Sequence, residues 1–121
     1  MFSIDDLNAV KACEVPHEFE VKLGGEPSGV FLQVLGDESE TVATETAALI
    51  AAARARANTN PNYVSDNTKL GKQLAALRVV GWRGIKEEYS RENAAKLCMS
   101  NMAIADQVIQ TSKNLGNFIK L

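Results

Sequence analysis

The sequence predicts an α+β fold, with an N-terminal β-hairpin followed by a mostly α-helical bundle. Residues 18–23 alternate polar and apolar side chains, the period of a half-buried strand, and residues 30–35 return as a second strand after a glycine-rich turn. From residue 39 onward, apolar residues recur every three or four positions, as in amphipathic helices. A chain of 121 residues is long enough to bury its own core. We therefore expect a single domain over 1–121.

Within that domain, residues 1–36 are expected to hold a short helix and the hairpin, and residues 37–121 the helical part. The short helix is predicted at 4–12, where Ser3 precedes two acids that suit the positive end of a helix. Its apolar positions have helical spacing: Ile4, Leu7 and Val10. The hairpin turn is expected at 24–29. A phosphate-binding loop is the alternative there, but the stretch lacks the G-x-x-x-x-G-K-[ST] pattern.

The longest helix is predicted at about residues 39–57, because acids crowd its start and arginines its end, which matches the helix dipole. One of its faces carries Val42, Thr46, Leu49, Ile50, Ala53 and Ala57. A flexible loop is expected near 58–64, where the sequence is polar and contains Pro61. A further helix is predicted from Ser65 or Asp66 to Val80, with Gly81 as its stop.

The closing segment begins with an irregular connector from Trp82 to Tyr89. Ser90 is expected to cap a helix at about 91–99, and Ser100 a second helix at about 101–115. The second helix has an apolar stripe made of Ile104, Val108, Thr111 and Leu115. Residues 118–121 form an apolar tail.

Charge and composition argue against several classes of function. Residues 1–60 carry ten acidic and four basic side chains, and residues 61–121 carry five and nine. This polarity is compatible with a homo-oligomer, but neither half is basic enough to predict nucleic-acid binding. No signal peptide and no apolar run of the ~20 residues that span a membrane are present, so the cytoplasm is the expected compartment. Cys13 and Cys98 lack C-x-x-C spacing and are expected to be reduced and half-buried.

We expect the protein not to be an enzyme and to need no cofactor. Its adjacent acids, Asp5/Asp6 and Glu87/Glu88, are better explained as solvated charges than as an acid–base pair. No serine lies in a G-x-S-x-G motif, and no cluster of metal-ligand residues is spaced to bind a metal. The single histidine, His17, is expected at the surface.

Partner binding is the better expectation. Trp82 lies between Gly81 and Gly84, where it either plugs a gap between helices with its indole N–H bonded or serves as an aromatic anchor in a binding groove. Chain ends fray unless they dock. The apolar residues at this end are therefore candidate partner contacts, more so than the tryptophan: Leu115, Phe118, Ile119 and Leu121.

Several segments together carry a family resemblance: V-V-G-W-R-G-I at 79–85, Y-S-R-E-N-A-A-K-L at 89–97, I-A-D-Q-V at 104–108 and N-F at 117–118. With V-F-L-Q-V-L-G-D-E-S-E at 30–40, the pattern resembles the small tail assembly chaperones of long-tailed bacteriophages and prophages. The resemblance implies a non-enzymatic protein that binds the tape measure protein and keeps it soluble while tail tube subunits polymerise around it.

The same resemblance implies the cytoplasm of the bacterial host as the place of action. Members of this family are often made in two lengths by translational frameshifting, and the chain would suit the shorter form. No catalytic residue comes with the family pattern. The alternative is a structural virion component of a phage or prophage, such as a minor tail or head–tail connector subunit.

Overall fold

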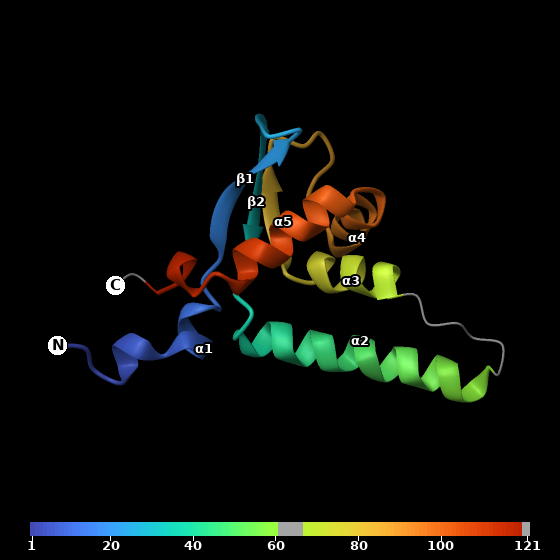
Figure 1. Ribbon diagram of the computed structural model, residues 1–121, viewed down its shortest axis with the longest axis horizontal. Coiled ribbons are helices and arrows are strands. Elements are labelled where there is room, and N and C mark those ends of the chain that lie inside the picture. Colours follow the sequence, from blue (N-terminus) through green and yellow to red (C-terminus); the bar gives the residue numbers. More distant parts are fainter. Residues whose placement is uncertain (61–66, 120–121) are drawn as a thin grey trace.

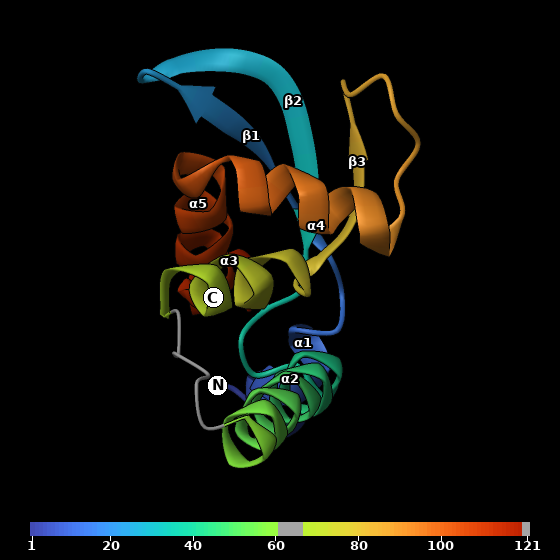
Figure 2. The same cartoon turned by 90° about the vertical axis from the view of Figure 1, so that its right-hand side faces the viewer.

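The computed structural model, which describes residues 1–60 and 67–119, has the predicted α+β class with the hairpin first and the helices after it (Figure 1). Strands β1 (His17–Leu23), β2 (Glu26–Val34) and β3 (Val79–Arg83) form one antiparallel sheet in the order β1-β2-β3. Three helices pack together against it: α3 (Asn67–Ala76), α4 (Arg91–Ser100) and α5 (Met102–Lys113). The long helix α2 (Glu40–Thr59) lies beyond α3, away from the sheet (Figures 1 and 2).

The hairpin turn is tighter than the sequence predicted. Gly24 and Gly25 have φ angles of 59° and 83°, and Leu23 pairs with Glu26 directly across them. Two consecutive residues with positive φ make the turn whose twist matches that of the flanking strands. Residues 26–29, predicted as part of the turn, therefore belong to β2. Gly29, with a φ of 77°, marks the irregular pairing opposite residues 20–22.

A third strand replaces the end of a predicted helix. The helix expected to run to Val80 ends at Ala76, and Val79–Arg83 instead pairs with β2. β-branched and aromatic residues fit a pleated sheet better than a helix, and here they meet apolar partners, since Trp82 pairs with Leu32. The irregular connector predicted from Trp82 to Tyr89 is confirmed only from Gly84 onward, because Trp82 and Arg83 belong to β3, and the prediction of Gly81 as a helix stop was wrong. The part of the chain after residue 37 is thus not purely helical.

The core lies between the sheet and the α3–α4–α5 group. Its members include Leu32 and Val34 of the sheet and Val108 of α5, each fully buried. Cys98 belongs to the same cluster, and Cys13 is buried near Gly36. Both cysteines are free thiols, but they are fully buried rather than half-buried. Burial raises the pKa of the Cys98 thiol to about 11, so this thiol remains protonated.

The N-terminal helix is broken in two. A 3₁₀ turn at Asp5–Leu7 is followed by α1 (Ala9–Ala12), because the Asn8 side chain accepts a hydrogen bond from the Lys11 N–H and starts a new helix. The predicted capping by Ser3 is confirmed, since its hydroxyl accepts from the Asp6 N–H. The expected apolar face does not pack against the core, because Ile4, Leu7 and Val10 are 90%, 53% and 49% exposed.

Helix α2 begins at the predicted place, where the Ser39 hydroxyl accepts from the Val42 N–H at 3.0 Å. It extends to Thr59, slightly past the predicted end at residue 57. Residues 61–64 of the loop predicted at 58–64 lie outside the described residues. The predicted caps Ser65 and Asp66 lie outside them as well. No helix within 1–60 and 67–119 combines the length and apolarity needed to cross a membrane.

The last two helices match the prediction except at their junction and at the end of the second helix. Ser90 caps α4 by accepting from the Asn93 N–H at 3.0 Å, as expected. Ser100 is the last residue of α4 rather than the cap of the next helix, and α5 starts after Asn101. α5 ends at Lys113, so Leu115 lies in a 3₁₀ turn beyond the helix instead of extending its stripe.

Candidate functional site

A groove of the described surface lies between α3 and α5. It encloses a cavity of about 410 Å³, a size at which proteins bind ligands and anchor side chains. Leu74 and Ile109 supply half-buried apolar side chains to its walls, and Met102, at 52% exposure, lies at one end. The two helices are in direct contact below the groove.

Gly71 leaves this groove open. It is the one glycine in α3, and a Cβ added there would meet no atom within 4 Å. A larger residue at this position would project into free space rather than into the core. Glycine disfavours a helix by about 1 kcal/mol relative to alanine, so α3 is less stable than it would be with a filled groove.

The rim of the groove is more basic than acidic. Lys72 and Lys113 flank it, and Asp106 is the exposed acid among the lining residues. Lys72 also donates to the Met99 carbonyl of α4 at 3.3 Å. The groove therefore combines an apolar floor with donors at its edge, an arrangement suited to the apolar face of an amphipathic helix that carries acids beside it.

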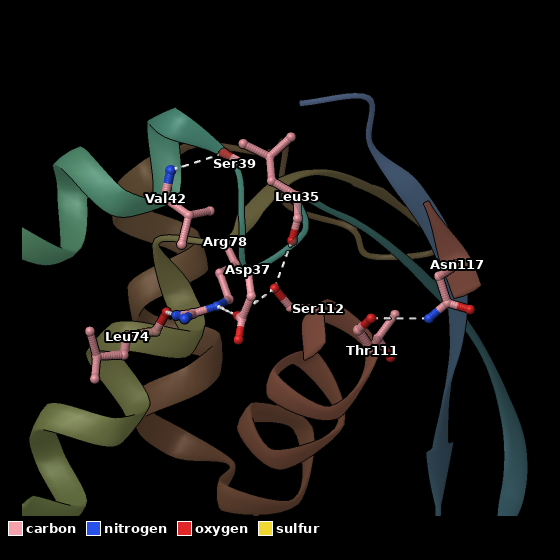
Figure 3. A network of polar contacts seen from close by, with 9 residues as sticks. All are labelled: Leu35, Asp37, Ser39, Val42, Leu74, Arg78, Thr111, Ser112 and Asn117. Carbon is pink, nitrogen blue, oxygen red and sulfur yellow. Dashed lines mark hydrogen bonds and ion pairs between the residues drawn. The ribbon is translucent and has the colours of Figure 1, made fainter. Parts of the chain in front are cut away.

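A buried polar network fixes the two helices at one end of the groove (Figure 3). The Arg78 guanidinium, after the end of α3, donates to Asp37 Oδ1 at 3.0 Å and also to the Leu74 carbonyl. The Ser112 hydroxyl on α5 lies 2.8 Å from the Leu35 carbonyl and 3.0 Å from Asp37 Oδ1, so both are acceptors for its proton. The residues that follow β2 thus hold α3 and α5 at a set separation.

Trp82 borders a second, smaller cavity of about 270 Å³ with Ile85 and Leu97. It is half-buried, and its indole N–H donates to the Glu87 carbonyl at 2.9 Å. Its ring meets that of Tyr89 edge-on, with centroids 5.4 Å apart. The tryptophan therefore packs the 84–90 connector against β3, as the plug interpretation expected, although it does so from a strand and not between helices.

The predicted C-terminal contacts lie elsewhere. Phe118 is half-buried against the core, with its ring centroid 5.8 Å from that of His17 at the start of β1. Ile119 is half-buried, Leu115 is 40% exposed, and Leu121 lies outside the described residues. Trp82 is on β3 and Phe118 beside β1, the two opposite edges of the sheet, so the five predicted residues do not form one surface. Their use as partner contacts stays a prediction.

The α3–α5 groove itself was missed. Leu74 and Ile109 lie in helices that the sequence predicts, but the sequence does not show that these two residues face each other across a groove. Gly71 was the available signal, because a glycine inside an otherwise helical pattern often marks a packing or binding role.

The other residues considered for chemistry lie at the surface or make contacts between strands. The acids considered as catalytic pairs, Asp5/Asp6 and Glu87/Glu88, are all exposed. In the described part of the chain, no group of three or more His, Cys, Asp or Glu side chains is placed to hold a metal ion. Arg83 donates to both carboxylate oxygens of Glu18 and lowers the pKa of that carboxyl, which ties β3 to β1 across the sheet.

Comparisons of this chain with models of protein families, with curated proteins and with solved structures found no match.

Proposed function

We propose that this protein is a tail assembly chaperone of a long-tailed phage or prophage, which binds the tape measure protein in the cytoplasm of the bacterial host. The observation that carries the proposal is the groove between α3 and α5, whose walls include Leu74 and Ile109. A tape measure protein is long and helical and aggregates when it is unprotected. Together with the sequence pattern at 79–108, a groove that takes the apolar face of a helix supports this role.

The groove suits a chaperone because such a protein must hold its partner and then release it to the growing tail tube. Each large apolar side chain buried in the groove would contribute about 1.5–3 kcal/mol, from which the cost of association is subtracted. A few anchor residues along one helix face therefore give reversible binding. Many such sites on one long partner would together keep it soluble.

Co-expression tests this function. The tape measure protein of the same phage or prophage is produced alone and together with this chain, and its soluble fraction is measured. We expect it to be insoluble alone, and soluble and co-purifying with this chain when the two are made together. Equal insolubility in both cases would overturn the chaperone function.

A structural virion component is the second candidate, and the exposed N-terminal segment favours it. Phe2, Ile4 and Val15 are 56%, 90% and 67% exposed, a pattern expected of a segment that is covered in an assembly. Mass spectrometry of purified particles separates the two functions. A structural subunit is present in fixed copy number, whereas a chaperone is absent from the mature particle.

A further inference from the structure

Helix α2 makes few close contacts with the other helices and strands of the described chain. Val42 is its one fully buried residue. The polar contacts that tie it to the rest lie near its start, where Glu14 accepts from the Thr41 N–H and hydroxyl, and Arg91 forms an ion pair with Glu45. At 1.5 Å per residue the helix is roughly 30 Å long, and most of this length extends away from the sheet (Figures 1 and 2).

The solvent-facing side of α2 has a charge pattern that is complementary to itself. Glu40, Ala47 and Arg54 follow each other at intervals of seven residues, so they lie on one face of the helix. All three are exposed, whereas Val42 and Thr46 face the body of the protein. Glu40 lies at the start of this face and Arg54 lies near its end, each seven residues from Ala47.

We propose that α2 pairs antiparallel with α2 of a second copy of this chain, with the twofold axis near Ala47. In this arrangement Glu40 of each copy lies beside Arg54 of the other, which forms two ion pairs. A parallel arrangement would place Glu40 beside Glu40 and Arg54 beside Arg54, and like charges at such positions repel. The charges thus favour the antiparallel over the parallel arrangement.

Exposed apolar side chains lie at the same end of the helix as Glu40. The N-terminal segment is attached there, because Glu14 binds Thr41 and the Cys13 carbonyl accepts from the Gly36 N–H at 2.9 Å. Leu7 and Val10 of this segment are about half exposed. Exposed ion pairs contribute little free energy on their own, so the two ion pairs set the register of the dimer rather than its affinity.

Cysteine cross-linking tests the register. In Ala47→Cys the two new thiols meet at the axis, and oxidation with copper–phenanthroline is expected to give a covalent dimer. The matched control is Ala52→Cys, which is equally exposed but lies roughly 140° around the helix. The native Cys13 and Cys98 are 1% and 0% exposed and are not expected to react. Equal cross-linking at 47 and 52, or none at 47, would overturn the proposal.

Charge reversal tests the complementarity without a covalent bond. By sedimentation velocity, Glu40→Arg and Arg54→Glu are each expected to weaken dimerisation about tenfold, since each replaces two attractions by two repulsions. The double variant, which carries both reversals, is expected to restore it. A native chain that stays monomeric at all soluble concentrations, or a dimer indifferent to both single reversals, would contradict the proposal. Neither result bears on the binding of the tape measure protein in the α3–α5 groove.

Discussion

The side-chain amide of Gln107 on α5 forms two hydrogen bonds with the backbone of Lys22 on β1. Its Oε1 accepts from the Lys22 N–H at 2.8 Å, and its Nε2 donates to the Lys22 carbonyl at 2.8 Å. A neighbouring antiparallel strand would make the same pair of bonds. β1 is an edge strand of the sheet, so the amide occupies one point at which another chain could pair.

Gln107→Glu is expected to destabilise the fold by about 1 kcal/mol, because a carboxylate cannot donate to the Lys22 carbonyl. Urea unfolding measures this loss. Gln110→Glu on the exposed side of the same helix is the control and is expected to change stability by less than about 0.5 kcal/mol. Equal midpoints for the two variants would show that the Gln107 amide contributes nothing.

The Arg78–Asp37 pair predicts a larger effect. Arg78 is 9% exposed, so removing Asp37 leaves a buried charge whose remaining partner is the uncharged Leu74 carbonyl. Asp37→Ala is expected to cost about 2–3 kcal/mol, less than the roughly 3–5 kcal/mol for a fully buried pair, because the Asp37 side chain is 34% exposed. Asp37→Asn keeps an acceptor oxygen and should cost less. A loss below about 0.5 kcal/mol in Asp37→Ala would contradict the structural role of the network.

Stability should fall in acid because of Glu14 and Glu18. Hydrogen bonds from Thr41 hold the pKa of Glu14 below its ordinary value of 4.5, and Arg83 does the same for Glu18. A carboxyl whose pKa is lowered by folding stabilises the protein above that ordinary value, and this contribution is lost as pH falls through the folded-state pKa. Urea midpoints are therefore expected to decrease below about pH 4.5. The doubly substituted Glu14→Gln, Glu18→Gln chain should show a flatter decrease, and an unchanged slope would refute the assignment.

Phe118 tests whether the C-terminal segment belongs to the fold. Its contacts with the core and with His17 predict that Phe118→Ala lowers stability by about 1–3 kcal/mol. Leu115→Ala, at a 40% exposed position, is the control and should cost less than about 0.5 kcal/mol. If both variants unfold at the same midpoint as the native chain, the segment is free for a partner, as the sequence predicted.

The sequence was sufficient for elements whose signals are local. Ser39 and Ser90 cap their helices through bonds that span three residues, and the alternation around Val21 specifies a strand by itself. β3 could not be predicted in this way, because Val79–Arg83 becomes a strand only through pairing with residues 31–34, far away in the sequence. The tertiary partner outweighed the weak helical pattern that continues from α3.

The α3–α5 groove could not be predicted from the sequence for the same reason. Leu74 and Ile109 each belong to an ordinary apolar stripe, and what makes them a site is the way α3 and α5 meet. That contact depends on the polar residues Arg78 and Ser112. Both are buried, and their burial could not be predicted from the neighbouring sequence.

Filling the groove tests the proposed function most directly. The tape measure protein is co-expressed with the Gly71→Leu chain or with the Gly71→Ala chain, and its soluble fraction is measured. Both substitutions favour the α3 helix and neither Cβ meets a neighbouring atom within 4 Å, but only the leucine extends into the cavity. We expect Gly71→Ala to keep the partner soluble as the native chain does, and Gly71→Leu to leave it insoluble while remaining folded. Equal solubilisation by the two variants would contradict binding in the α3–α5 groove.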